Sequence, residues 1–542
     1  MALETEPGNR GLARVLRKAG RWLGLAALLI LGVALRCWNV ADVWIGGKLY
    51  FVDPDGYSRM TRVAAVLREP GSVLRQHFFE NWPLGIIPHT TAPLDYLIAG
   101  LAVILRPSDP AAAADWAGAL ISIGFGVATM IFLWSWAGPR RYRAAMLALF
   151  AVSPILVHGT LFGRPDHQSA LIFLLAVALG AEAVLLRETS RRWSVTAGAA
   201  WGAALWVSLY EPLLLFAAVL LLGVALRGRR YFARERWAGW GTLLVILLIA
   251  LAIERWRPLL PDAEVIRYFP DWSRNIGELQ PASFSTLLRW SLAWLPLAPL
   301  ALWAAARRRE GGDPSGWFWL GLLLVTAGLT FWQARWGYFF SLVFVMSLPM
   351  QAATLERWLG GRRWAVAVLG LLALWPVARD WDDRFNEGEL ARRAQARQEH
   401  AALRDVALRI KKLAADRRDG EPVPILAPWW HSPALAYWSG QPCVAGSSHQ
   451  SLPGTVASAR FFLQNDPEAA LKLLGEREVG VVVVDDPVRV LQNSAQLLGE
   501  PPPAHPEAPL GYRLYTRPNQ PPPGLEPVYR NRAFVLMRRT AW

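Results

Sequence analysis

The stretch PLLLFAAVLLLGVAL (residues 212–226) decides the fold class, together with the segments that follow it. It is uncharged, and it is followed by the basic segment RGRRYFARER (227–236) and a second uncharged run, GTLLVILLIALAI (241–253). Apolar runs of nearly membrane-spanning length that alternate with basic clusters are typical of membrane helices. The sequence therefore predicts a polytopic α-helical membrane protein.

The composition agrees with this prediction. Of the 542 residues, 54% are hydrophobic and 18% are charged, and 29 are tryptophans. The formal net charge of +15 could indicate a nucleic-acid partner. However, the arginines cluster between apolar runs, so we attribute the charge to membrane topology and expect no nucleic acid. With Cys37 and Cys443 as the only cysteines, a disulfide framework is excluded.

The positive-inside rule sets the predicted topology. Basic residues at 10–21 place the N-terminus in the cytoplasm, and no small-residue cleavage site follows, so we expect an uncleaved first span. The run TAPLDYLIAGLAVIL (91–105) would invert every later basic loop if it crossed the membrane. We therefore interpret it as a re-entrant or surface helix. About eleven spans result, at 22–40, 113–136, 144–161, 169–186, 194–209, 211–226, 237–253, 286–306, 315–332, 336–353 and 363–378.

An odd number of spans places the C-terminal region outside. We expect a helical membrane domain at 1–379 with a large first outer loop at 41–110, and a soluble extracytoplasmic α/β domain at 380–542. Within that domain the pattern predicts a helix at 388–416 and a strand at 479–486.

Polar residues gather at span ends on the predicted outer face, where an unneeded charge would be costly if buried in hydrocarbon. Asp53 and Asp55 follow the first span, and Asp166, His167 and Gln168 lie between two later spans. Such oxygen and nitrogen donors suit a divalent cation such as Mg²⁺ or Mn²⁺. A cation at this position could neutralise a phosphate as it leaves.

Two further residues complete the set. Glu278 lies in the predicted outer loop NIGELQP (275–281), and Arg335 stands at the outer start of a late span, where its guanidinium could clamp a phosphate. Each motif also has a structural interpretation. Asp-Pro-Asp-Gly forms turns, Asp166 could cap a helix, and Arg335 could be a snorkelling residue. All of these residues are predicted on the outer face of the membrane, and this shared location favours a joint chemical role.

In this order the motifs resemble the catalytic subunit of oligosaccharyltransferases, including the single-subunit bacterial and archaeal enzymes, which belong to the GT-C class of membrane glycosyltransferases. Asp55-Gly56-Tyr57 is similar to the family's first acidic motif, with Asp53 as a second candidate. Asp166-His167-Gln168 resembles the archaeal Asp-His-His motif, although its last position is an amide.

The later motifs extend the resemblance. Glu278 is similar to the family glutamate that contacts the acceptor amide, and Arg335 to the arginine that binds the lipid-linked pyrophosphate. Trp429-Trp430-His431 falls where the family has Trp-Trp-Asp, which grips the Ser/Thr hydroxyl of the acceptor. An imidazole in place of the carboxylate can still accept a hydrogen bond. The tryptophan pair could instead anchor the domain at the membrane interface.

The resemblance implies transfer of a glycan from a polyprenyl-phosphate or polyprenyl-pyrophosphate donor to an acceptor such as protein asparagine, outside a prokaryotic plasma membrane. It implies catalytic roles for Asp55 and Glu278, a Mn²⁺ or Mg²⁺ ion at Asp53, Asp55, Asp166, His167 and Gln168, donor-phosphate binding by Arg335, and acceptor binding by Glu278, Arg289, Trp429, Trp430 and His431.

Two alternatives remain open. A GT-C enzyme could act on a lipid, a cell-wall polymer or another glycan, which the exchange of Asp for His431 favours. A transporter is the non-enzyme alternative, although Glu182 and Glu211 alone do not outline an ion path.

Overall fold

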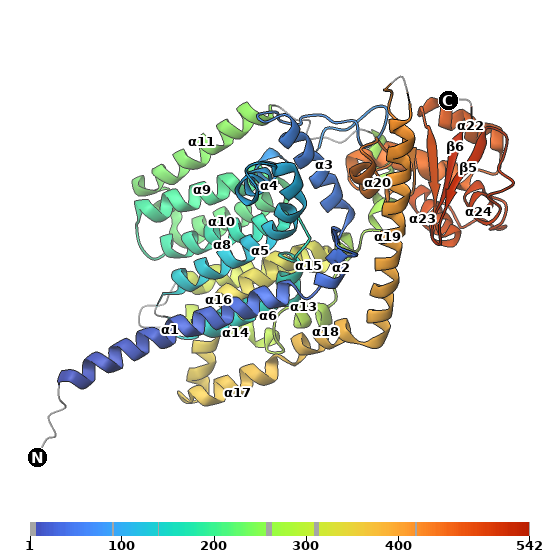
Figure 1. Cartoon of the computed structure of the whole chain (residues 1–542). Helices are drawn as coiled ribbons and strands as arrows, with labels where there is room; N and C mark the ends of the chain where they lie inside the picture. Colours follow the sequence, from blue (N-terminus) through green and yellow to red (C-terminus); the bar gives the residue numbers. More distant parts are fainter. Residues whose placement is uncertain are drawn as a thin grey trace, which may run out of the picture.

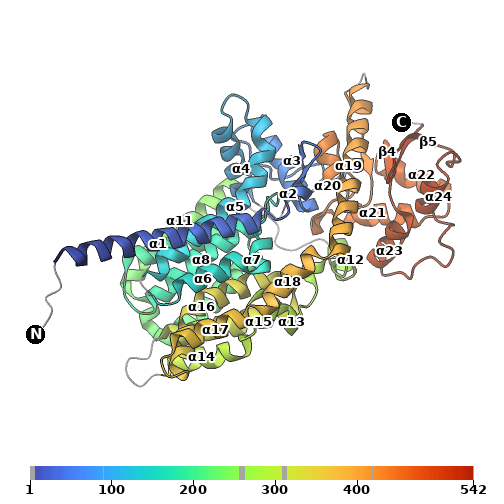
Figure 2. The same cartoon turned by 60° about the horizontal axis from the view of Figure 1, so that its bottom comes forward.

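The computed structural model describes residues 7–88, 91–138, 140–255, 263–307, 314–417 and 420–540. A helical bundle forms one end of the molecule and a region of helices around a sheet forms the other (Figure 1). The long helix α19 (Glu387–Ala415) lies between them, as the turned view also shows (Figure 2).

Seven stretches of the described chain are helices long and apolar enough to cross a membrane, or eight if a bent pair counts as one span. They include α5 (Pro110–Ala137), α8 (His167–Leu185), α10 (Tyr210–Arg227), α11 (Trp237–Glu254), α15 (Pro314–Trp332), α16 (Gly337–Trp358), and α17 (Arg363–Ala373) with α18 (Trp375–Phe385). Other predicted spans are covered by the short apolar part of α1 (Pro7–Arg36), at Trp22–Arg36, and by the 17-residue helix α9 (Arg191–Val207). The count of about eleven stays a prediction.

Two predicted spans are broken rather than continuous. The run 144–161 forms α6 (Arg143–Val152) and α7 (Pro154–His158), because Pro154 has no N–H to continue the first helix and starts the second. The run 286–306 forms α13 (Phe284–Trp290) and the stretch Leu295–Ala306, which contains α14 (Ala298–Ala306), with a bend of 94° between them. Pro296, which has no N–H, lies at the start of the second part.

The segment 41–110 carries the first elements that build the site. After α2 (Val40–Val43), β1 (Trp44–Ile45) and β2 (Lys48–Leu49) form a hairpin. Helix α3 (Pro54–Arg68) starts where the Asp53 carboxylate accepts the Gly56 N–H at 2.9 Å. The predicted helix at 91–105 is α4 (Ala92–Leu105). Its buried Asp95 pairs with Arg59 at 2.7 Å and Arg62 at 3.0 Å, which ties α4 to α3.

The C-terminal region contains both elements predicted for it. Helix α19 occupies almost the whole of the predicted 388–416, and the predicted strand is β4 (Val481–Val484). The sheet order is β3-β4-β6-β5, in which β3 (Ile425–Leu426) is parallel to β4, while β6 (Val535–Arg539) is antiparallel to β4 and to β5 (Leu525–Arg530). Four helices lie around this sheet (Figure 1): α21 (Leu452–Leu463), α22 (Pro467–Glu476), α23 (Pro487–Leu498) and α24 (Leu510–Thr516). Because α18 runs across residues 379–380, the domain boundary there stays a prediction.

The two ends of the chain share an apolar core. The Tyr57 ring of α3 lies 4.9 Å from the Trp438 ring of α20 (Ser432–Ser439), and the Tyr437 hydroxyl donates to Asp115 of α5. A second core joins α12 (Ala263–Ser273) to α21 and α23, with Trp272 buried in it. These contacts hold α3 against α20, and α12 against α21 and α23, although the paired helices are far apart in the sequence.

Candidate functional site

A small cavity of about 40 Å³ lies where α3, the start of α8 and the turn 446–449 meet. This volume is enough for a few water molecules. Its polar walls come from three parts of the chain that are far apart in sequence: Asp55, Ser58, Arg59, Arg62, His77, Glu80, Asp166, His167, Ser447 and Ser448. Of the predicted site residues, it thus brings Asp55, Asp166 and His167 together.

Arg164 organises the acidic residues beside this cavity. Its Nε donates to an Asp53 oxygen at 2.8 Å, and its guanidinium lies 3.4 Å from Asp166. It also donates to the Tyr338 hydroxyl at 2.9 Å. The Asp166 carboxylate accepts the His167 N–H at 2.6 Å at the start of α8, so Asp166 is also a helix cap, as the structural interpretation held. Asp53 caps α3, whereas the structural interpretation of its segment was a turn.

Asp55 differs from its two neighbours because it forms no ion pair with the described residues. Asp55 lines the cavity and is exposed there, although protein atoms surround it closely, and its carboxylate accepts a hydrogen bond from Ser447. Burial, and then the charges of Asp53 and Asp166, raise the pKa of Asp55 to about 7. Asp55 is therefore the carboxylate with surplus negative charge around it.

The electrostatic environment of Asp166 is the opposite, because cationic groups lie around its carboxylate. Burial alone would raise the pKa of Asp166, but His167, Arg164 and Arg59 together hold it below its usual value. The carboxylate of Asp166 therefore stays ionised at the wall of the cavity, and Arg164 fixes its position.

Glu80 is a buried carboxylate that sequence reasoning missed. Burial raises the pKa of Glu80 to about 8, and Ser58 donates a hydrogen bond to it. Ser448 lies 3.5 Å away, so the carboxylate links α3 to the C-terminal turn. Beside it, the buried His77 ring is stacked on Phe79 with ring centroids 3.6 Å apart. Nothing in the surrounding sequence HFFENWP (77–83) marks either residue as functional.

Arg335 and Glu278 form a second group close to the first. Arg335 pairs with the buried Glu211, and its other terminal nitrogen lies 3.9 Å from Glu278. The Arg335 Nε is buried and has no hydrogen-bond partner among the described residues. Neither residue lines the cavity, although the charge of Glu278 contributes to the raised pKa of Asp55. Glu211 acts here as the counter-ion of Arg335.

The tryptophan pair lies apart from the cavity. The Trp429 ring is 6.4 Å from that of Trp272 in α12, the helix that leads to Glu278. Both indole nitrogens of Trp429 and Trp430 are buried without a hydrogen-bond partner among the described residues. His431 is buried too, and its Nε2 lies 2.6 Å from Asp485.

Two other predictions concern charges elsewhere in the bundle. Arg289 pairs with Asp383 of α18 at 2.6 Å, and among the described residues no hydrogen bond or ion pair joins it to the cavity. Glu182 pairs with Arg236 at 2.8 Å, and Glu211 with Arg335. Both buried carboxylates therefore have cationic partners, which does not favour an ion path for a transporter.

The cavity residues suit a divalent cation in their chemistry. Asp55 has uncompensated negative charge, and the Oε1 of Gln168 is buried and accepts no hydrogen bond from the described residues. However, the described carboxylates here do not form a compact group of three donors; that arrangement occurs at Glu399, His431 and Asp485 instead. An ion here would keep water or substrate oxygens among its ligands, as Mg²⁺ commonly does.

Comparison with known proteins identifies the fold. No family model matches the chain. Dolichyl-phosphooligosaccharide-protein glycotransferase 2 of Archaeoglobus fulgidus is 24% identical over 163 residues, which are 29% of this chain and 26% of that protein. The match thus spans about a quarter of the relative.

Solved structures match over most of the chain. The Archaeoglobus fulgidus oligosaccharyltransferase in complex with Zn and sulfate has a TM-score of 0.70 at 14% identity, covering 94% of this chain and 79% of that one. ArnT from Cupriavidus metallidurans bound to undecaprenyl phosphate has a TM-score of 0.52 at 14% identity, covering 96% and 98%. The chain is an integral membrane protein with the GT-C fold, and the predicted resemblance to oligosaccharyltransferases is confirmed at the level of fold.

Proposed function

We propose that this chain is a membrane glycosyltransferase that transfers a glycan from a polyprenyl-phosphate or polyprenyl-pyrophosphate donor, with protein asparagine as its acceptor. The observation that carries the proposal is the unpaired Asp55 beside ionised Asp166, in a cavity next to the Arg335–Glu278 pair. The relative's name gives a dolichyl-phospho-oligosaccharide and a protein as its two substrates. ArnT was solved with undecaprenyl phosphate.

Arg335 would bind the donor phosphate. Glu211 and the Tyr210 ring, whose centroid lies 5.6 Å from the guanidinium carbon, hold the side chain in place. Its Nε is still without a partner among the described residues, so an N–H remains for a phosphate oxygen. A guanidinium is well suited to bind phosphate through two hydrogen bonds at once.

The surrounding carboxylates would repel that phosphate, which is the reason to propose a cation. Asp55 and Asp166 would hold Mn²⁺ or Mg²⁺, with Asp53, His167 and Gln168 as the further ligands to test. The ion would offset negative charge on the departing phosphate. Arg164 pairs with Asp53 and Asp166 and fixes the orientation of both carboxylates.

The acceptor would approach from the side of Glu278. This carboxylate is about a third exposed and would accept a hydrogen bond from the acceptor nucleophile, with Asp55 sharing that role. For a peptide acceptor, Trp429, Trp430, His431 and Arg289 are the proposed contacts. Their polar atoms are turned inward or paired, so a peptide would have to rearrange this region.

That inward arrangement favours a second candidate, a GT-C enzyme with a lipid, cell-wall or glycan acceptor. His431 is hydrogen-bonded to Asp485 rather than free to bind a Ser/Thr hydroxyl. For either acceptor we propose the same topology: about eleven spans in a prokaryotic plasma membrane, the N-terminus in the cytoplasm and residues 380–542 with the cavity outside.

A single assay separates the two candidates. The purified full-length protein is incubated in detergent with Mn²⁺, a polyprenyl-pyrophosphate oligosaccharide and a fluorescent peptide containing Asn-x-Thr, and the peptide is followed on a gel. A shift that disappears in Asp55→Asn and Glu278→Gln, and persists in the exposed controls Asp382→Asn and Glu264→Gln, supports asparagine transfer. Consumption of donor with no peptide shift supports the other acceptors. No donor consumption in any condition contradicts both.

A further inference from the structure

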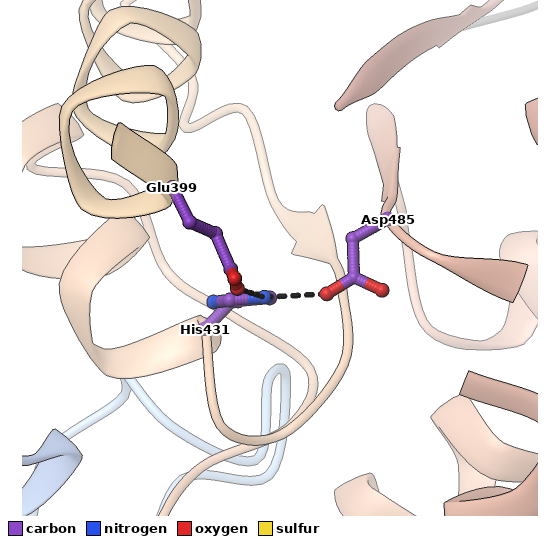
Figure 3. A group of neighbouring side chains, drawn as sticks. All are labelled: Glu399, His431 and Asp485. Atoms are coloured by element: carbon purple, nitrogen blue, oxygen red, sulfur yellow. Dashed lines mark hydrogen bonds and ion pairs between the residues drawn. The ribbon is translucent and has the colours of Figure 1, made fainter. Parts of the chain in front are cut away.

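Three potential metal ligands lie together in the C-terminal region, outside the cavity described above. Glu399 comes from α19, His431 from the segment before α20 and Asp485 from the end of β4 (Figure 3). One ligand atom from each lies within 4.8 Å of the others. The Nε2 of His431 is 2.6 Å from an Asp485 oxygen and 3.4 Å from a Glu399 oxygen.

Two of the three residues, His431 and Asp485, are buried, and Glu399 is partly buried, which distinguishes the cluster from an ordinary surface group of acids. Asp485 is 3% exposed and His431 is 4% exposed. The second Asp485 oxygen, Oδ1, is buried and accepts no hydrogen bond from the described residues. A buried carboxylate oxygen without a partner is costly, and a metal ion would satisfy it.

The local charges favour a cation. Arg489 lies 3.1 Å from Glu399 and its guanidinium carbon is 4.8 Å from the Trp430 ring centroid, so it offsets one of the two carboxylates. Among the described residues, no arginine or lysine pairs with the other carboxylate, that of Asp485. The Phe534 and Trp430 rings pack on His431 and limit the movement of the imidazole.

We propose that Glu399, His431 and Asp485 form a second divalent-cation site, of the zinc type, separate from the cation proposed at Asp55 and Asp166. One imidazole nitrogen and two carboxylate oxygens are three ligands that Zn²⁺ accepts, with a water as the fourth. A proton and a zinc ion compete for the same imidazole nitrogen, so zinc binding weakens as the pH falls.

The site has a structural consequence for its neighbours. It would join α19, the segment that carries His431 and the residue that follows β4 through one ion (Figure 3). Because His431 directly follows the tryptophan pair, the ion would fix the position of both rings. This holds whichever acceptor the protein uses, so the inference does not depend on the proposed glycosyl transfer.

Zinc binding to the purified full-length protein tests the inference. The protein is first stripped with a chelator, and Zn²⁺ is then titrated in competition with a metal-binding indicator. The background is Asp55→Asn with Asp166→Asn, so that the cavity cannot contribute the signal. We expect this background to bind one Zn²⁺ per chain and to unfold at a higher temperature when zinc is present.

Adding Asp485→Asn or His431→Gln to this background should weaken zinc binding by at least about 100-fold, since loss of even an outer partner of a metal ligand costs about 10–100-fold. The matched controls Asp486→Asn and His505→Gln, which remove an adjacent carboxylate and an exposed imidazole, should leave it unchanged. The inference is overturned if the background protein binds no zinc, or if all four variants bind it equally.

Discussion

The Asp95→Asn substitution would leave two buried guanidinium groups without a counter-charge. The Asp95 carboxylate lies 2.7 Å from Arg59 and 3.0 Å from Arg62. The exposed fractions of the three side chains are only 4–7%. Asparagine has almost the same shape and keeps one acceptor oxygen, so the substitution removes charge with little change in packing.

The size of the effect follows from this burial. Removing one partner of a buried ion pair costs about 3–5 kcal/mol, because the remaining charge is neither solvated nor paired. Because asparagine keeps one acceptor oxygen, we expect Asp95→Asn to lower the free energy of unfolding by about 3 kcal/mol, the lower end of this range. The measurement is unfolding of the full-length protein in mixed micelles by SDS titration, followed by tryptophan fluorescence.

The control is an exposed ion pair of the same chain. Lys472 and Glu476 lie 4.0 Å apart, with side chains 79% and 63% exposed. Glu476→Gln should therefore cost less than about 1 kcal/mol. If Asp95→Asn costs no more than this control, the cluster is not held by charge and the reasoning fails. A second readout is the affinity of the cavity for a divalent cation. Arg59 and Arg62 line the cavity, and without Asp95 they would compete with the cation for its carboxylate ligands.

Three further predictions address the donor, the cation and the bundle. Arg335→Lys keeps the charge but loses the planar fork, so the KM for the polyprenyl donor should rise about tenfold or more; an unchanged donor KM would contradict phosphate binding at this residue. Gln168→Glu adds a charged ligand and should lower the Mn²⁺ concentration for half-maximal activity roughly tenfold; if that concentration does not fall, Gln168 is not near the ion. Gly198→Ala would place a methyl group 2.0 Å from the Gly239 carbonyl oxygen between α9 and α11, so we expect a loss of at least about 1–3 kcal/mol in SDS unfolding, whereas Gly241→Ala meets open space and should be tolerated.

Periodicity and charge predicted much of the fold. Long uncharged runs such as those of α10 and α11 have few structural alternatives, so their bounds agree to within a few residues. Breaks inside apolar runs were missed, because the runs at 144–161 and 286–306 remain hydrophobic where the backbone changes direction. The prolines at 154 and 296 were the available signals.

The candidate site was predicted only where one short segment carries its own signal. Asp55 and Asp166 are charges at span ends, which hydropathy makes conspicuous. Arg164 was overlooked although it is two residues from Asp166, because its partner Asp53 is 111 residues away. The contact of Ser448 with Glu80 spans 368 residues. Pairings of this kind depend on the folded arrangement and leave no local pattern.

The hydrogen bond between Tyr437 and Asp115 has a consequence for how the chain is made. The two residues are 322 positions apart. At a synthesis rate of about 5–20 residues per second, roughly 16–64 s pass between the synthesis of Asp115 and that of Tyr437. During that interval the aromatic face of Tyr50, Phe51 and Tyr57 has no cover from α20. This aromatic face therefore lacks its native cover until α20, in the last quarter of the chain, has been synthesised.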